Sequence, residues 1–347
     1  GIDPLEMADG HGYGADAVRF SLVSRCAQGQ QDLRFSEKMI ADVRNFTTKI
    51  WNATRFVLMN LDGFDHRAGA PDPAALGLAE RWIRSRYARA AQAVTGHFEA
   101  FEFDRAARVL YDFIWGEYCD WFVEAAKVDL PRGRAAVQHT LWAVLAGTMQ
   151  LLHPIMPFLT EEVWQQLPHD GDTIMRSPWP APPPAWLDPE AERAMEIMMD
   201  VVRAVRSLRA ELSLPLAQRL PVQLRAAAPL AATLRDGAPY LAWLARTEAP
   251  AFASLDAAHP AGSVTLVLSG LEISVPLAGL GDPARERDRI RRALSELEAE
   301  RGRVAQRLGD EAFVRRAPAA VVQRDRARVA DLEERRARLR EILEALA

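Results

Sequence analysis

The sequence is poor in cysteine and in lysine. Cys26 and Cys119 are its two cysteines, and neither has a partner at CxxC spacing, so neither a disulfide framework nor a zinc site is indicated. Lys38, Lys49 and Lys127 are the three lysines, and every other basic residue is an arginine. Codon bias explains that preference as well as a functional need would.

Long apolar runs are also lacking. No stretch of the sequence is long enough to span a bilayer, and no signal peptide opens the chain. The seven histidines include no HExxH motif and no pair at metal-ligand spacing. We therefore expect a soluble, cytoplasmic protein with no membrane partner and no metal site.

What the sequence does contain is enough apolar material for a large core. Hydrophobic residues make up 49% of the 347 residues, and this length favours two or three domains. The formal net charge is −4, so any contact with a nucleic acid must come from local basic patches.

The rest of the chain is organised around one long predicted helix, residues 36–61. This stretch contains neither proline nor glycine, and Ser36 stands where it could cap the first turn. On a helical wheel of about 100° per residue the apolar side chains share one sector. That sector holds Met39, Val43, Phe46, Ile50, Ala53, Val57 and Leu61. The opposite side carries Arg44, Thr48, Asn52 and Arg55, with Asn45, Lys49 and Trp51 beside them.

The polar side of this helix has two interpretations. Arginines, amides and one aromatic ring can bind a phosphate backbone and stack a base. The same residues also suit a solvated helix face whose tryptophan packs on a neighbouring helix. From this helix alone, the solvated face is the favoured interpretation.

An antiparallel helical bundle is predicted at residues 36–168. Further helical patterns follow the first one at 75–100, from 103 onward, at 135–153 and at 160–167. Pro154 and Pro157 are expected to break the chain before the last of these helices. The helix that starts at 103 combines aromatic with acidic residues, so we interpret its aromatics as core and not as an RNA contact.

The flanking segments differ from the bundle in composition. Residues 1–35 contain a short amphipathic helix at 15–24, and residues 169–190 form a proline-rich linker that Trp179 and Trp186 should attach to the bundle. A small α+β unit is predicted at 191–281. Its elements are a helix at 191–212, a strand at 220–225, one or two helices at 230–244, and a hairpin of strands 264–268 and 271–276 around Ser269-Gly270.

The last segment, 282–347, alternates arginine with acidic residues and repeats leucine in heptads. From Ala284 onward it holds 17 arginines and 13 acidic residues, a net charge of +4, which leaves −8 for the remainder of the chain. Two heptad helices joined by a short loop predict an antiparallel coiled-coil hairpin. A basic arm on an acidic protein indicates a polyanionic partner, although an ordinary solvated coiled coil has the same pattern.

The heptads also predict how the two helices of this arm pair. Folding the arm about Phe313 sets Val304 opposite Val322. The same register sets Arg301 opposite Asp325, which would make a polar layer that fixes the pairing.

Five segments, in order along the chain, resemble one known family. They are GIDPLE at 1–6, YGADAVRF at 13–20, RNFTTKIWNATRF at 44–56, HPIMPFLTEEVW at 153–164 and the FVxxAP pattern at 313–318. Together they resemble the C-terminal part of valyl-tRNA synthetase, a class I aminoacyl-tRNA synthetase. The resemblance covers essentially the whole chain. It implies a fold that is mainly α, with an anticodon-binding bundle, a small α+β subdomain and a coiled-coil arm.

The resemblance implies the ATP-dependent joining of valine to its tRNA as the parent activity. The family's HIGH-type motif, its Lys-Met-Ser-Lys-Ser loop and its editing domain are not found in this sequence, so we expect no valine activation by this chain alone. The expectation is that no cofactor binds here and that ATP and magnesium bind a missing N-terminal catalytic domain. That domain and valine tRNA are the implied partners, and the family implies a monomer.

The resemblance also suggests which residues contact tRNA. The bundle would recognise the anticodon, and the arm would lie along the tRNA corner. The bundle residues are Arg44, Asn45, Lys49, Trp51, Asn52 and Arg55. The arm residues are Arg315 and Arg316 near the tip and Arg303, Arg307, Arg324 and Arg328 on the flanks, while Arg19 would contact the inner stem.

Two alternatives stay open at this point. The isoleucyl, leucyl and methionyl enzymes share the bundle, although the FVxxAP tip of the heptad hairpin favours valine. A free-standing tRNA-binding factor without a catalytic partner would need the same surfaces.

Overall fold

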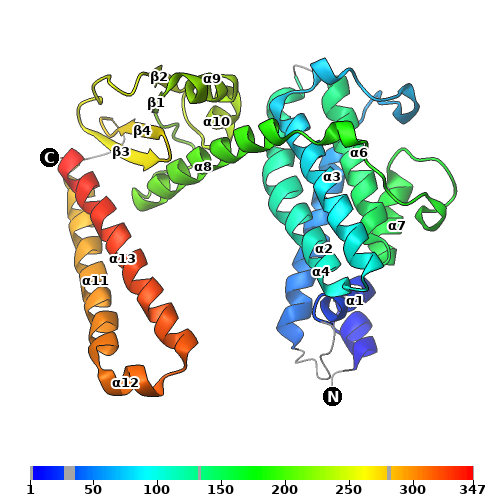
Figure 1. The fold of residues 1–347 in the computed structure, drawn as a ribbon, viewed down its shortest axis with the longest axis horizontal. Helices are drawn as coiled ribbons and strands as arrows, with labels where there is room; N and C mark the ends of the chain where they lie inside the picture. The colour runs from blue at the N-terminus through cyan, green and yellow to red at the C-terminus, as the bar shows by residue number, and fades with distance from the viewer. Residues whose placement is uncertain (1–2, 27–35, 132–133, 280–282, 347) are drawn as a thin grey trace. The chain divides into compact units, whose positions relative to one another are not determined.

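The computed structural model describes residues 3–26, 36–131, 134–279 and 283–346. The chain forms two compact units, residues 1–197 and 198–347, and Figure 1 labels most of their α-helices and strands. The predicted fold class is confirmed: a helical bundle, a small four-stranded sheet with helices, and an antiparallel helical hairpin. Within the described residues, none of the helices has the length and apolar character needed to cross a membrane.

The first unit is an all-helical bundle followed by a linker. Its α-helices are α1 (Ala15–Val23), α2 (Glu37–Asn60), α3 (Leu78–Glu99), α4 (Phe103–Asp112), α5 (Val123–Asp129), α6 (Arg134–Leu152) and α7 (Pro157–Gln166). Two π-helical segments, η1 (Glu6–Gly10) and η4 (Phe113–Phe122), and four short 3₁₀ turns complete it. The 3₁₀ turns are η2 (His66–Ala68), η3 (Pro73–Ala75), η5 (Ile174–Arg176) and η6 (Pro184–Trp186).

Helix α2 has the boundaries and the buried face that its sequence predicts. Phe46, Ile50 and Val57 are fully buried, because the apolar sector packs on α1, α6, α7 and η4. Ser36 occupies the N-cap position with an extended backbone, but its side chain makes no capping hydrogen bond. Met39, predicted inside, is only half-buried, and Ile40 takes the core position in its place.

Two local predictions about the bundle need correction. Pro157 does not delay the next helix to residue 160; it starts α7, because proline lacks an N–H that the first helical position does not use. The helix predicted from residue 103 runs through α4, η4 and α5, and its middle is π-helical. A π-helical segment changes which side chains face the core, and α-helical spacing cannot show this.

The linker lies on the bundle through its tryptophans, as predicted. The indole N–H of Trp179 donates to the Thr95 hydroxyl at 2.9 Å. The Trp186 ring lies 5.9 Å from the Tyr87 ring and 5.0 Å from the Arg84 guanidinium carbon, measured to the Trp186 centroid.

The second unit begins inside α8 (Pro189–Glu211), so the two compact units divide at 197/198, whereas composition placed a boundary at 190/191. Its sheet has the order β2-β1-β4-β3, with β1 and β2 parallel and the other pairs antiparallel. The predicted hairpin is confirmed, and Gly270 provides the positive φ of its turn. The elements are β1 (Gln223–Ala226), α9 (Ala228–Asp236), α10 (Ala238–Leu244), β2 (Ala251–Ala253), β3 (Ser263–Leu268) and β4 (Leu271–Pro276).

The C-terminal arm is an antiparallel pair, α11 (Pro283–Gly309) and α13 (Ala319–Ala345), as the heptads predict. Its predicted register is wrong. Asp325 pairs with Arg307 at 2.7 Å, and Arg301 pairs with Glu333 at 3.4 Å. The cause is a short tip helix, α12 (Glu311–Arg316), which Asp310 caps by accepting the backbone N–H of Ala312. This helix moves the turn beyond Phe313, so each α11 residue meets a later residue of α13.

Candidate nucleic-acid interface

The outer side of α2 presents two arginines that are unpaired within the part of the chain that the structure describes. Arg44 and Arg55 are exposed, and within the described part of the chain neither guanidinium makes a hydrogen bond or an ion pair. Asn45 and Asn52 are exposed on the same side. These guanidinium and amide groups are free to bind phosphate and base edges.

Trp51 lies at one edge of this surface. It keeps 37% of its area exposed, and it makes no ring contact with another aromatic residue among those the structure describes. The alternative that Trp51 packs on a neighbouring helix stays a prediction, since most of its surface is covered. An exposed indole next to arginines can stack on an unpaired base.

Lys49 lies at the other edge and is occupied within the bundle. Its ammonium pairs with Asp120 and lies 3.9 Å from the centroid of the Trp115 ring. An ammonium held between a carboxylate and an aromatic face is less available to a phosphate than the arginines of α2. Lys49 thus joins α2 to η4.

Two aromatic residues beside Lys49 were missed by the sequence analysis. Tyr111 and Trp115 are half-buried and stack on each other, with centroids 5.7 Å apart and ring planes 18° apart. Phe46 supports them from α2, with its ring 4.8 Å from that of Tyr111. The interpretation of all aromatics in this segment as core is wrong for these two, although it holds for Trp121 and Phe122. Their i, i+4 spacing was the available signal.

Arg19 contributes to the fold by joining two sequence motifs. Its Nε and Nη2 donate to the carbonyls of Ile155 and Pro154 at 3.0 and 3.2 Å, at the end of α6. One turn earlier, the Asp16 carboxylate accepts the backbone N–H of Leu159 at the start of α7. Burial raises the pKa of Asp16, and the backbone N–H groups of Leu159 and Phe158 oppose that shift. The YGADAVRF segment therefore fixes the α6–α7 connection.

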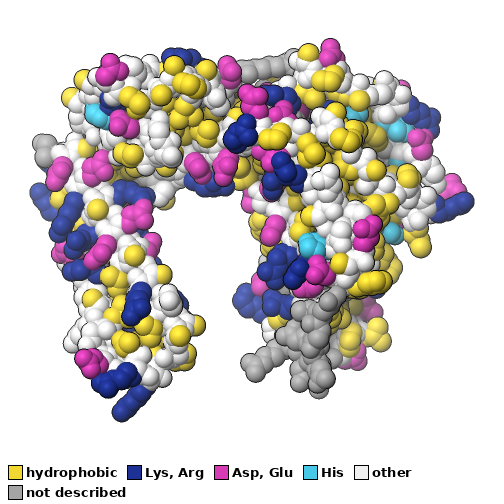
Figure 2. Space-filling model, in the orientation of Figure 1, with side chains coloured by type: hydrophobic (Ala, Val, Ile, Leu, Met, Phe, Trp, Pro, Cys, Tyr) yellow, Lys and Arg dark blue, Asp and Glu magenta, His cyan; other side chains and the backbone are white. Residues whose placement is uncertain are grey.

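The arm mixes charges of both signs along its length, as the dark blue and magenta side chains in Figure 2 show. Three of the six arm arginines expected to contact tRNA are in ion pairs, which reduces their availability. The pairs are Arg307 with Asp325 at 2.7 Å, Arg315 with Glu311 at 2.9 Å, and Arg328 with Glu300 and Asp331 at 2.8 and 3.0 Å.

The other three arm arginines are exposed and unpaired among the described residues. Arg316 belongs to the tip helix, Arg303 to α11 and Arg324 to α13. They are the arm cations most available to a polyanion, because no local carboxylate has to be displaced.

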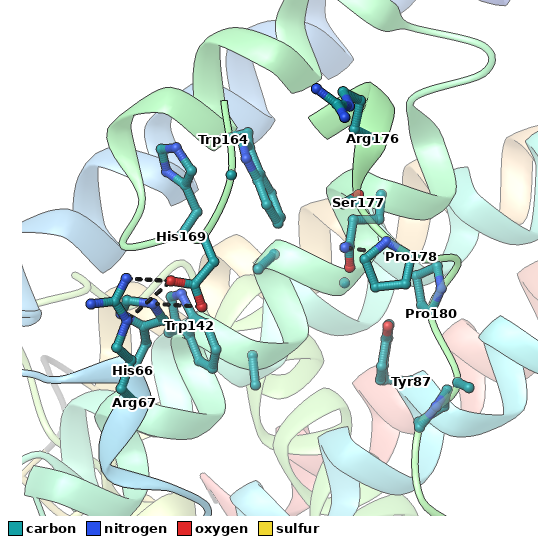
Figure 3. Close-up of a pocket in the computed structure, with 18 of the residues that line it drawn as sticks. His66, Arg67, Tyr87, Trp142, Trp164, His169, Arg176, Ser177, Pro178 and Pro180 are labelled. Carbon is teal, nitrogen blue, oxygen red and sulfur yellow. Dashed lines mark hydrogen bonds and ion pairs between the residues drawn. The ribbon is translucent and has the colours of Figure 1, made fainter. Parts of the chain in front are cut away.

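The bundle also contains a cavity of about 600 Å³ between α3, α6, α7 and the linker (Figure 3). Its walls are aromatic: Tyr87, Trp142, Trp164 and Trp186 line it. Gly147 is needed there, because a Cβ at this position would lie 2.0 Å from the Tyr87 hydroxyl oxygen.

Opposite charges meet at the rim of this cavity. The Arg67 guanidinium pairs with Asp170, and Nε2 of His66 lies 3.5 Å from the same carboxylate, as the dashed lines in Figure 3 mark. The hydrogen bond from Arg67 holds the pKa of Asp170 below its usual value. The cavity therefore suits an aromatic or apolar group better than a phosphate.

Comparisons with known proteins identify the relatives of this chain. A family model described as the anticodon-binding domain of tRNA ligase matches residues 80–224, and one described as the valyl tRNA synthetase tRNA binding arm matches residues 282–347. Curated valine–tRNA ligases match almost the whole chain. That of Carboxydothermus hydrogenoformans is 42% identical over 94% of this chain, and that of Syntrophotalea carbinolica is 39% identical over 100%.

The chain belongs to the valyl-tRNA synthetase family. It spans 37% and 39% of the length of those two relatives, so it corresponds to a part of such an enzyme. The isoleucyl, leucyl and methionyl alternatives are not favoured by these matches. A solved LeuRS–tRNA complex from Agrobacterium radiobacter, 19% identical, covers 54% of this chain and 22% of its own, but its TM-score of 0.42 is too low to bear on the fold.

Within this valyl-tRNA synthetase portion, the two candidate surfaces differ in whether a family model covers them. The six arm arginines fall inside the segment matched as a tRNA binding arm. The α2 residues precede the segment matched as an anticodon-binding domain, whereas Tyr111 and Trp115 lie inside it. The α2 surface therefore rests on its geometry and on its contact with η4.

Proposed function

We propose that this chain is the tRNA-binding portion of a valine–tRNA ligase and that the outer side of α2 recognises the anticodon. One observation carries the proposal: Arg44 and Arg55 are exposed, lack partners among the described residues, and share a side of α2 with two asparagines. Unpaired cations next to amides and stacking rings are what a splayed RNA loop requires.

Each group on this surface has a distinct role in the proposal. Arg44 and Arg55 bind phosphates, and Asn45 and Asn52 hydrogen-bond to base edges. Trp51 stacks on a base from one edge. The Tyr111–Trp115 pair offers a second stacking surface, and Lys49 orients it through its contact with Trp115.

The arm adds affinity that depends little on sequence. In the proposal it lies along the tRNA corner, with Arg303, Arg316 and Arg324 as its first phosphate contacts, because these three are unpaired among the described residues. Arg307, Arg315 and Arg328 contribute once their carboxylate partners are exchanged for phosphates. Arg19 supports the inner-stem contact by fixing the segment in which it lies.

The proposal extends to the parent enzyme. It joins valine to its tRNA with ATP in the cytoplasm, and the ATP and Mg²⁺ sites belong to a catalytic domain outside this chain. We further propose a monomer, which the pairing of the two heptad helices within one chain supports.

The test is binding of this chain to valine tRNA and to a tRNA with another anticodon, measured by fluorescence anisotropy over a salt series. We expect a preference for valine tRNA and an affinity that falls steeply with salt. Arg44→Gln and Arg55→Gln should each weaken the binding of valine tRNA by roughly tenfold. Together they should abolish the preference, because the phosphates that both arginines hold position the loop for Asn45 and Asn52.

The control is Arg105→Gln, which removes the same charge from an α4 arginine that is paired with Glu102. It should leave the preference intact. Equal affinity of the unmodified chain for both tRNAs would contradict anticodon recognition by α2, and light scattering that shows a dimer would contradict the monomer.

A further inference from the structure

The second unit contains a cleft with an unusual charge balance. Its volume is about 380 Å³, and it lies between the end of α8, the loop after it and the end of α10. Among the described residues, Arg206, Arg209 and Arg246 are the only charged side chains that line it. The described residues of its wall thus gather positive charge and include no carboxylate.

Arg209 lies at the buried end of this cleft. It is only 4% exposed, and its guanidinium donates to the carbonyls of Pro215, Gln218 and Arg246 at 3.0, 2.7 and 2.8 Å. Its Nε is buried without a hydrogen-bond partner among the described residues. Burial and then the nearby charge of Arg246 lower the pKa of Arg209. A buried charge in this situation is stabilised by any anion that reaches it.

Arg246 forms the open side of the cleft. Its side chain is exposed, and the described residues offer it neither an ion pair nor a hydrogen bond. Its φ is +53°, and Ser213, which lines the same cleft, has a φ of +50°. Residues other than glycine adopt this conformation at a cost, and such strained positions concentrate where chains bind ligands.

Apart from Ser213, the remaining described wall residues are apolar. Leu214 and Leu244 line the cleft, and Leu216 keeps 67% of its surface exposed beside it. Apolar walls lower the local dielectric and strengthen the attraction between the arginines and an anion.

A purely structural role does not account for the whole arrangement. Arg206 and Arg209 do tie neighbouring loops together, since both donate to backbone carbonyls. Carbonyl dipoles supply no net negative charge to the buried guanidinium of Arg209, however. The exposed guanidinium of Arg246 plays no part in these hydrogen bonds.

We propose that this cleft binds a phosphate group and that the RNA backbone supplies it. That RNA supplies the phosphate rests on the proposed function, whereas the phosphate site itself is argued from the residues of the cleft alone. Arg246 is the phosphate contact at the open side of the cleft, and Arg209 adds positive charge from its buried end. A free phosphate is the other source of the same chemistry, and the experiment separates the two.

The first measurement is isothermal titration of the chain with inorganic phosphate at constant ionic strength, balanced with chloride. We expect saturable binding that Arg246→Gln weakens at least tenfold and Arg246→Lys weakens less. Arg203→Gln is the matched control, because it removes an arginine of the same helix α8 that pairs with Asp200 instead. Arg246 is exposed, so its variants should fold, which circular dichroism checks. No binding, or equal binding by the original chain and Arg246→Gln, would overturn the phosphate site.

The second measurement is anisotropy with valine tRNA over a salt series. Arg246→Gln should lower the slope of log affinity against log salt by about one, as expected for the loss of one phosphate contact, and Arg203→Gln should not. An unchanged slope together with lost phosphate binding would overturn the RNA source and leave free phosphate as the ligand. If the original chain binds no tRNA but binds phosphate through Arg246, the proposed function fails while the phosphate site stands.

Discussion

The bundle and the arm are both built from antiparallel helices, yet they use their charged residues in opposite ways. The bundle buries charges: Arg84 donates to the Thr140 hydroxyl at 2.9 Å inside the core, and Glu80 is buried in the same helix. The arm keeps most of its charges at the surface and pairs many of them, as Arg328 does with Glu300. Its core is one seam between two helices.

This difference shows that net charge is a poor measure of a binding surface. The arm is the basic part of the sequence, but half of its six candidate arginines are paired with carboxylates. The bundle belongs to the acidic remainder, and yet α2 presents Arg44 and Arg55 without partners among the described residues. What matters to a polyanion is the unpaired cation and not the total charge.

The largest expected effect distinguishes the two cores. Phe46→Ala should lower the free energy of unfolding of the bundle by about 3–5 kcal/mol, because its ring is fully buried against Tyr111 and Phe20. Leu332→Ala in the arm should cost about 2–3 kcal/mol, since a two-helix seam can close over the gap.

Tryptophan fluorescence separates these effects, because eight of the nine tryptophans lie in the first unit and the arm contains none. Phe46→Ala should shift the fluorescence-detected unfolding, whereas Leu332→Ala should shift only circular dichroism. A fluorescence shift in Leu332→Ala as large as that of Phe46→Ala would contradict separate cores.

The second effect concerns the buried charge of the bundle. Burial, and after it the charge of Asp129, raises the pKa of Glu80 to about 7, from 4.5 in the unfolded chain. The folded bundle therefore binds the proton more tightly, so this contribution to stability is complete below pH 4.5 and is lost as pH rises through 7. Compared with Glu80→Gln, the original chain should lose about 3 kcal/mol of unfolding free energy between pH 4.5 and pH 8.

Denaturant unfolding followed by tryptophan fluorescence at several pH values measures this difference. The comparison with Glu80→Gln cancels other titrations, such as that of His139, whose pKa is lowered to about 4 by burial and by Arg84. A difference between the two proteins that does not change with pH would show that Glu80 is ionised in the bundle.

The smallest effect tests whether pairing limits the arm. Arg324→Gln removes an arginine that is unpaired among the described residues, and Arg328→Gln removes one that is bound to Glu300 and Asp331. We expect Arg324→Gln to lower the salt slope of tRNA binding by about one and Arg328→Gln to lower it by less. Equal slopes, measured by anisotropy on the same tRNA, would show that the carboxylates of the arm exchange freely for phosphates.

Helix positions were predictable because apolar periodicity and proline placement are local properties. The range 36–61 became α2 almost residue for residue, and the hairpin around Gly270 formed as expected. The three-residue strand β2 was not predictable, since it is too short to show a pattern. The arm register also failed, because Asp310 caps a tip helix that heptad counting cannot include.

The candidate surface was predicted only in part, for a related reason. The sequence identified the polar side of α2 but placed Lys49 among the tRNA contacts, whereas the fold brings Asp120 and Trp115 to it across a long separation in sequence. It treated the aromatics of the helix from residue 103 as core, whereas Tyr111 in α4 and Trp115 in the π-helical η4 are half-buried.

The sequence by itself determined the family, the helix pattern and the presence of a basic arm, because these depend on local order and composition. The tertiary structure decided which arginines are free. Pairing such as that of Arg307 with Asp325 depends on which side chains two packed helices bring together. A shift of register changes every such pair while leaving the composition of both helices the same.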